Sequence, residues 1–144
     1  FARIRPMVNQ METHIYNQQK TLKTWAEKYD IRLEAWGPFG EGRNGIFTDE
    51  TIAEIAAAHG KTPAQVMLRW NLQRGVVVIP KSTHIERMEE NFNVFDFTLS
   101  EDEMAKIDAL DKKESAFFLH NDPERVEWFF ENALIATHDR ERKS

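Results

Sequence analysis

The sequence contains no cysteine, and this absence excludes several kinds of chemistry at once. Without thiols the chain can form neither disulfides nor thiolate metal sites, and it has no cysteine nucleophile. The histidines are His14, His59, His84, His120 and His138, and no two of them lie four residues apart. A zinc site would need ligands from distant segments, so the sequence predicts no metal centre.

Long apolar runs and an excess of basic residues are absent as well. No apolar stretch approaches the roughly 18 residues that a membrane helix requires, and neither a signal peptide nor a lipidation motif is found. The net charge of -5 argues against nucleic acid, whose protein partners normally present a basic face. We expect a soluble cytoplasmic protein without a membrane or nucleic-acid partner, in which a few local cations can still hold a small anionic ligand.

The residues that are present describe an ordinary globular protein, with 41% hydrophobic and 30% charged side chains. A chain of 144 residues has the length of one domain and can bury roughly two-thirds of its unfolded surface. Three short runs have strand character: residues 7–12, 31–36 and 75–80. The third, GVVVIP, is a continuous β-branched run, which is typical of a parallel strand covered on both faces.

Helical patterns separate these runs, so the order is strand, helix, strand, helix, helix, strand. Such alternation predicts parallel strands joined by right-handed crossovers. The helix starts and stops are marked by Gly60 as a C-terminal cap and by capping boxes at Thr62–Gln65, Thr83–Glu86 and Ser100–Glu103. We expect helices to follow the third strand from about residue 84 to 93 and from about 100 to 110, with a last one within 122–138.

Several apolar stripes on these helices are predicted to be buried, because they recur at helical spacing. They are Leu22, Trp25, Ala26 and Tyr29; Ile52, Ile55 and Ala56; Ile85, Met88 and Phe92; and Val126, Phe129, Phe130 and Ala133. Trp70 and Trp128 also fall on such stripes. The tail DRERKS is expected to be frayed.

The stretch IPKSTHIERMEEN gathers polar side chains where a strand passes directly into a helix. A helix N-terminus offers unpaired N–H groups and a positive dipole, which together attract phosphate. Lys81 and Ser82 fall at that place, Arg87 follows one turn later, and Glu90 with Asn91 offers an acceptor and a donor for an adenine edge. The spacing indicates a nucleotide phosphate site, but a capped helix with a solvated face explains it equally well.

The longer stretch IPKSTHIERMEENFNVFDFTLSEDEM resembles the C-terminal NADPH-binding signature of the aldo-keto reductases. VNQMETHIY and AWGPFG resemble that family's motifs at the ends of its sixth and seventh barrel strands, and ALDKKESAFFLHNDPERVEW is similar to the tail of bacterial diketo-gluconate reductases. The resemblance extends to about Trp128. It implies residues 1–128 as the C-terminal portion of an aldo-keto reductase barrel and residues 129–144 as a helical extension with a frayed tail.

The resemblance also implies a role for individual residues. Lys81, Ser82 and Arg87 would hold the adenosine 2′-phosphate, with backbone from Thr83, while Glu90 and Asn91 would contact adenine. Gln10 matches the glutamine that bonds the nicotinamide carboxamide, and Trp36 matches the aromatic that stacks on the nicotinamide ring. Phe39 matches an apolar position beside the pyrophosphate loop. Gly37 and His84 stand where many relatives carry hydroxyl residues, so two phosphate contacts are expected to be missing.

Two other signals point to chemistry that the sequence does not support. GEGRNG fits the G-x-G-x-x-G pattern, but the dinucleotide fingerprint needs an acidic residue at a strand end about 20 positions later, where this chain has a helix. We expect a mobile loop over the cofactor instead. His14 and Tyr16 suggest a tyrosine acid with its histidine, but they match a structural turn after the sixth strand, with Ile15 in place of the usual proline.

We therefore expect an α/β fold: a partial (β/α)8 TIM barrel formed by the last three strand-helix units plus C-terminal helices. By resemblance it derives from an NADPH-dependent reductase of small aldehydes and ketones whose catalytic Asp, Tyr, Lys and His lie on earlier strands, so the chain alone is expected to be inactive. The alternatives are a non-catalytic nucleotide-binding or assembly module and a folding fragment without a ligand. Because both outer strands are predicted edges, self-association or a complementary N-terminal segment is expected.

Overall fold

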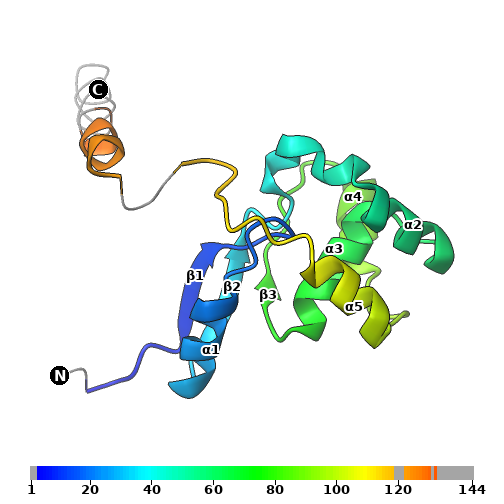
Figure 1. The fold of residues 1–144 in the computed structure, drawn as a ribbon, viewed down its shortest axis with the longest axis horizontal. Coiled ribbons are helices and arrows are strands. Elements are labelled where there is room, and N and C mark those ends of the chain that lie inside the picture. The colour runs from blue at the N-terminus through cyan, green and yellow to red at the C-terminus, as the bar shows by residue number, and fades with distance from the viewer. Residues whose placement is uncertain (1–2, 119–121, 131, 133–144) are drawn as a thin grey trace.

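Three parallel strands form one sheet in this computed structural model, which describes residues 3–118, 122–130 and 132 (Figure 1). The strands are β1 (Val8–Glu12), β2 (Arg32–Trp36) and β3 (Val77–Val78), in the order β1-β2-β3. The predicted parallel pairing and the two predicted edge strands are confirmed. The third strand is much shorter than predicted, since Pro80 has no backbone N–H to extend the ladder.

The helices follow the predicted order. They are α1 (Lys20–Lys28), a kinked 3₁₀ segment η1 (Gly40–Thr48), α2 (Glu50–His59), α3 (Pro63–Gln73), α4 (Ile85–Phe92) and α5 (Glu101–Asp108), and residues 123–130 are also helical. The capping boxes that begin with Thr62 and Ser100 are both present. Gly60 ends α2 in the left-handed conformation, as predicted.

The interior is divided into two clusters of buried side chains. The larger one joins the turn after β1 to η1, α2, α3 and α5, and its members are Ile15, Tyr16, Ile46, Ile52, Ile55, Ala56, Val66, Met67, Trp70, Leu99 and Ile107. The smaller one lies between α1 and the sheet and contains Ala26, Leu33, Ala35 and Val76. The predicted burial of the α2 stripe and of Trp70 is confirmed.

The two faces of the sheet differ in how they are covered. Leu33 and Ala35 of β2 point toward α1 and are buried, whereas Val8 and Gln10 of β1 lie on the exposed surface. Side chains alternate between the two faces of a strand, so Gln10 shares a face with its register partner Glu34. This second face is open along most of the sheet and is closed only near its C-terminal end.

The predicted stripe of α1 is confirmed for Ala26 and for the partly buried Leu22, which both pack in the smaller cluster, and it is wrong for Trp25 and Tyr29. Only Ala26 is buried, while Trp25 and Tyr29 are each about half exposed and stack on one another with ring centroids 6.1 Å apart. Lys28 lies over the Trp25 ring at 4.6 Å. The small Ala26 lets α1 pack closely against β2. The rings of Trp25 and Tyr29 are too large for this narrow space and lie at its edge.

Two expectations for α4 are also wrong. Ile85, Met88 and Phe92 are exposed rather than buried. The helix begins one residue later than the predicted Thr83–Glu86 box, with His84 as its N-cap and no side-chain cap. The Ser82 hydroxyl instead accepts the His84 N–H at 3.1 Å, and this short turn leaves Thr83 outside the helix.

The C-terminal stripe does not join the core either. Val126, Phe129 and Phe130 are exposed, and Trp128 is about half exposed. Phe129 packs instead against Phe118, with centroids 4.9 Å apart. The prediction for Ala133 and for the frayed tail lies outside the described residues, as does most of the predicted 129–144 extension.

No helix in the described ranges is long and apolar enough to cross a membrane. Among the same residues there is no group of three or more His, Asp or Glu side chains arranged to hold a metal ion.

Candidate cofactor site

A cavity of about 630 Å³ lies where four segments meet. Its lining comes from η1 and the residue before it, from the N-terminus of α3, from the segment after β3, and from α4: Phe39, Glu41, Gly42, Phe47, Thr62, Pro63, Ala64, Lys81, Ser82, Arg87, Glu90 and Asn91. The volume lies within the range of small-molecule sites, roughly 300–1,000 Å³. Six of the predicted cofactor residues, Phe39, Lys81, Ser82, Arg87, Glu90 and Asn91, therefore share one cavity.

The two basic side chains in this cavity are free to bind an anion. Within the part of the chain that the structure describes, neither Lys81 nor Arg87 bonds or pairs with another side chain. The two carboxylates are engaged: Glu41 pairs with Arg43 at 3.4 Å, and Glu90 accepts the hydroxyl of Thr62. Two unpaired cations beside the N-terminal end of α4 favour an anion in the cavity.

Gln65 fixes α4 relative to α3. Its side-chain amide donates to the backbone carbonyl oxygens of Glu90 and Asn93, at 3.1 and 3.0 Å, and its carbonyl oxygen accepts the backbone N–H of Thr62 at 3.0 Å. The side chain is only 6% exposed. The sequence identified Gln65 as a capping residue but not as this connection, because the second pair of contacts lies 25 and 28 residues away in the chain.

Four other predicted residues lie outside the cavity lining. Thr83 is exposed beside α4. Gln10 and Trp36 stand on the open face of the sheet, where the Gln10 amide donates to Glu34 at 2.6 Å. The Trp36 ring lies 4.9 Å from that of Phe117, measured between centroids.

Gly37 follows Trp36 in a left-handed conformation, with φ at +60°. A Cβ there would approach the Phe117 ring to 3.3 Å. Both the backbone conformation and the nearby ring therefore disfavour a side chain at this position.

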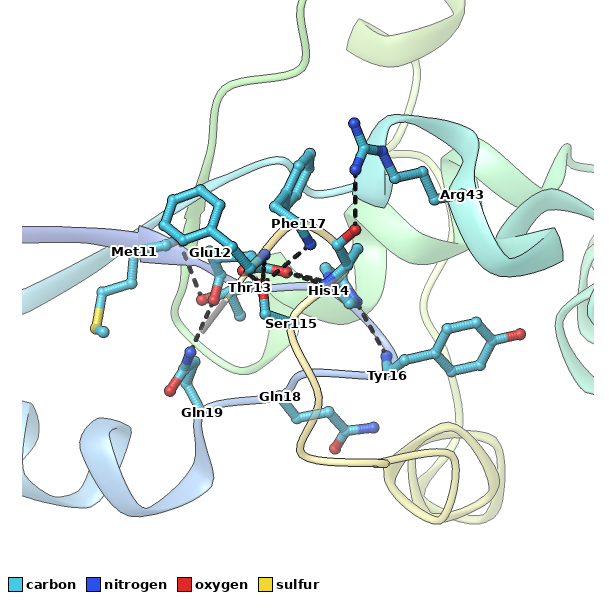
Figure 2. A network of polar contacts seen from close by, with 12 residues as sticks. Met11, Glu12, Thr13, His14, Tyr16, Gln18, Gln19, Arg43, Ser115 and Phe117 are labelled. Carbon is cyan, nitrogen blue, oxygen red and sulfur yellow. Dashed lines mark hydrogen bonds and ion pairs between the residues drawn. The ribbon is translucent and has the colours of Figure 1, made fainter. Parts of the chain in front are cut away.

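A buried polar network at the C-terminal end of β1 was not predicted from the sequence (Figure 2). Its centre is Glu12, which is 2% exposed and contacts His14 and the segment 115–116. The signal that was available is an acidic residue two positions before a histidine at a strand end, in METH. Its partner segment, more than 100 residues later, carries no recognisable pattern of its own.

His14 and Tyr16 are both buried, and their contacts agree with the structural role predicted for them. Tyr16 donates its hydroxyl to Asp49 at 2.8 Å, which joins the turn after β1 to the start of α2. Burial and this hydrogen bond raise the pKa of Tyr16 to about 12, so the phenol keeps its proton at neutral pH.

The η1 segment has the irregular backbone expected of GEGRNG, since Glu41, Gly42, Asn44 and Gly45 all have positive φ. Phe39 and Phe47 at its ends pack together with centroids 5.4 Å apart. The segment forms one wall of the cavity, which agrees with its predicted position beside a ligand, while its predicted mobility stays a prediction.

Residues 2–112 match the sequence profile described as "Aldo/keto reductase family". The chain belongs to the aldo/keto reductase family. Among curated relatives, it is 50% identical to the 9,11-endoperoxide prostaglandin H2 reductase of Trypanosoma cruzi, 49% identical to the glyoxal reductase of Bacillus subtilis and 43% identical to the methylglyoxal reductase DkgA of Escherichia coli. These alignments cover 76–78% of this chain and 40% of each relative.

Solved structures give the same result for the fold. The chain aligns with MGS-M4, an aldo-keto reductase from a deep-sea metagenome library, at a TM-score of 0.81 and 41% identity, covering 84% of this chain and 45% of that one. A Gox0644 variant in complex with NADPH aligns at 0.76 and 45% identity, covering 84% and 43%. The chain thus spans about two-fifths of the relatives it matches, and its three parallel strands with helices are consistent with part of a (β/α)8 barrel.

Proposed function

We propose that this chain is the NADPH-binding C-terminal part of an aldo/keto reductase, formed by the last three strand-helix units of the barrel. The observation that carries the proposal is the shared cavity, which brings together six predicted cofactor residues from three separate segments. A capped helix with a solvated face, the alternative reading of the same residues, does not require a cavity or a second wall from η1. Complexes of family members with NADPH or NADP support the choice of cofactor.

The donors in the cavity fit the adenosine end of this cofactor. Lys81 and Arg87 supply two unpaired positive charges for the 2′-phosphate, and Ser82 adds a hydroxyl at the start of α4. Glu90 and Asn91 offer an acceptor and an amide to the adenine edge. Thr62, at the start of α3, holds the Glu90 carboxylate, so that side chain is oriented before a ligand arrives.

The nicotinamide end belongs to the open face of the sheet. Trp36 would offer an aromatic face to the nicotinamide ring, and Gln10, which also donates to Glu34, would offer its side-chain amide to the carboxamide. Bound NADPH supplies the hydride for reduction of a carbonyl carbon. This chain's part in that reaction is to bind and orient the cofactor, while the catalytic Asp, Tyr, Lys and His expected of the family match none of its segments.

The substrate class follows from the relatives alone. Glyoxal reductase and methylglyoxal reductase are named for small dicarbonyl compounds. By analogy, we propose small aldehydes and ketones as the substrates of the complete form of this protein. The individual substrate depends on loops of the barrel that have no counterpart in the 144 residues.

The preference for NADPH over NADH tests the proposal. We expect the chain to bind NADPH more tightly, with Lys81→Ala and Arg87→Ala each weakening NADPH by about tenfold or more, since charge-assisted contacts contribute roughly 1.5–3 kcal/mol. Lys106→Ala, on the exposed side of α5, is the matched control and should change nothing. Equal affinity for both cofactors in the wild-type chain would exclude the assignment of Lys81 and Arg87 to the 2′-phosphate.

A second candidate is an assembly module that associates through its exposed surfaces. The observation in its favour is the exposure of apolar side chains along β3 and α4, including Val77, Ile79 and Met88 beside an unpaired strand edge. Its partner is a second copy or a complementary N-terminal segment of the barrel. Association without measurable NADPH binding would favour this candidate over the first.

A further inference from the structure

The segment 115–118 crosses the C-terminal end of the sheet and is anchored there by Glu12 (Figure 2). One carboxylate oxygen of Glu12 accepts the hydroxyl of Ser115 at 2.6 Å, and the other accepts the backbone N–H of Ala116 at 2.7 Å. Ser115 extends the anchor, because its hydroxyl oxygen accepts the backbone N–H groups of Phe117 and Phe118, both at 3.0 Å. A single buried carboxylate thus orders four consecutive residues more than 100 positions away.

His14 completes the anchor from the other side. Its Nδ1 accepts the backbone N–H of Tyr16 at 3.2 Å, so the ring proton is on Nε2 and donates to Glu12 at 2.9 Å. Burial by itself would raise the pKa of Glu12, but the hydrogen bonds from Ser115, Ala116 and His14 outweigh it and hold the pKa below its ordinary value. Burial lowers the pKa of His14. The stable pairing is therefore a carboxylate with a neutral imidazole.

The anchored segment places one aromatic ring at the nicotinamide end of the proposed site. Phe117 packs on Trp36, with centroids 4.9 Å apart, and reaches over Gly37. Arg43 of η1 stacks on the Phe117 ring at 4.8 Å and donates to the carbonyl of Ala116 at 3.2 Å. The ring is thus held between the end of β2 and the loop that also lines the cavity.

We propose that Glu12 is a positioning residue for the nicotinamide end of the cofactor site, acting through Ser115 and Ala116 to seat Phe117 against Trp36. The inference rests on the proposed function, since it assigns a ligand to Trp36. Phe117 limits the orientations that the Trp36 ring can adopt, so the flat face offered to the nicotinamide is set before binding. Without the anchor, the Trp36 ring is ordered only when the cofactor binds. The free-energy cost of ordering the ring then lowers the affinity for the cofactor.

Hydrogen exchange tests the anchor without any ligand. Glu12→Gln removes one of the two acceptor oxygens, and Ser115→Ala removes the hydroxyl, so we expect the amides of residues 116–118 to exchange about tenfold faster or more in each variant. Glu114→Gln, an exposed neighbour without a described partner, is the matched control. Unchanged exchange in a folded Glu12→Gln or Ser115→Ala variant overturns the anchor.

Two ligands test the positioning role. NADP⁺ and 2′,5′-ADP share the adenosine 2′-phosphate, but only NADP⁺ carries a nicotinamide. Glu12→Gln and Ser115→Ala should weaken NADP⁺ by about tenfold and 2′,5′-ADP by less than about twofold, whereas Lys81→Ala should weaken both.

Three results overturn the positioning role. Equal weakening of both ligands by the Glu12 and Ser115 variants would show a general effect on folding, and unchanged NADP⁺ affinity would show that the anchor does not reach the site. A wild-type chain that binds neither ligand overturns the proposed function and the role of Trp36 with it, while the exchange experiment still decides whether Glu12 anchors the segment.

Discussion

Replacing Gln65 by leucine should loosen the contact between α4 and α3 and thereby widen the cavity. Leucine has a similar volume but can neither donate to the carbonyl oxygens of Glu90 and Asn93 nor accept the N–H of Thr62. Three hydrogen bonds of 3.0–3.1 Å are lost at a side chain that is 6% exposed.

The expected loss can be worked out from these contacts. At about 1 kcal/mol for each hydrogen bond, the free energy of unfolding should fall by about 3 kcal/mol. With a urea dependence near 2 kcal/mol per molar, the unfolding midpoint moves down by about 1.5 M. Because α4 carries Arg87, Glu90 and Asn91, the same variant should also weaken NADPH binding.

Equilibrium unfolding in urea, followed by far-UV circular dichroism, measures the change. Glu89→Gln is the control, since Glu89 lies on the exposed side of α4 without a described partner, and it should stay within about 0.5 kcal/mol of the wild type. Unfolding of Gln65→Leu at the same urea concentration as the control would contradict the role given to the Gln65 amide. That result would mean that packing, and not this amide, holds the two helices together.

Three further predictions follow from other parts of the molecule. The purified chain should not oxidise NADPH with glyoxal-type or aromatic aldehydes above background, because a positioned proton donor contributes a factor of about 10² to 10⁴; turnover that persists in Tyr16→Phe would reveal a different active site. Stability should decrease as pH falls from about 7 to about 4, because the folded state holds the pKa values of both His14 and Glu12 below those of the unfolded chain. The unfolded chain therefore binds protons at higher pH than the folded chain does. Urea midpoints that stay constant over this range would contradict this prediction. The open edge at β3 and the exposed apolar face of α4 should cause self-association, and light scattering that shows a monomer at high micromolar concentration would contradict this.

The local signals in the sequence were sufficient for the elements and for much of the cavity. Capping boxes at Thr62 and Ser100 depend on residues three positions apart, and the sheet order follows from alternating strands and helices. The cavity residues Lys81, Ser82 and Arg87 are close together in the chain, so one stretch of sequence carries most of that information.

Burial was predicted poorly wherever it depends on which neighbours are present. Helical periodicity identifies an apolar side of α4, but Ile85 and Phe92 are exposed because no described element packs on that side. The same holds for Trp25 on α1. A stripe shows which side of a helix is apolar, whereas only the tertiary contacts decide whether that side is covered.

The Glu12 anchor shows the other limit of sequence reasoning. The buried Glu12 carboxylate is stabilised here by His14 and by Ser115 and Ala116, which reach it from a distant segment. Neither end of this interaction has a regular pattern, and an isolated Glu at a strand end is indistinguishable from a surface residue.

Chemical-shift mapping with NADPH decides whether the cavity and the Trp36 face form one cofactor site. In an ¹⁵N-labelled chain, saturable shifts are predicted for the backbone amides of residues 81–91 and for the indole N–H of Trp36, with both sets following one binding curve. The Lys81→Ala variant should move that curve to higher concentrations of NADPH. Saturable shifts confined to other residues, or no saturable shifts at all, would contradict the claim that this cavity and the Trp36 face form one cofactor site.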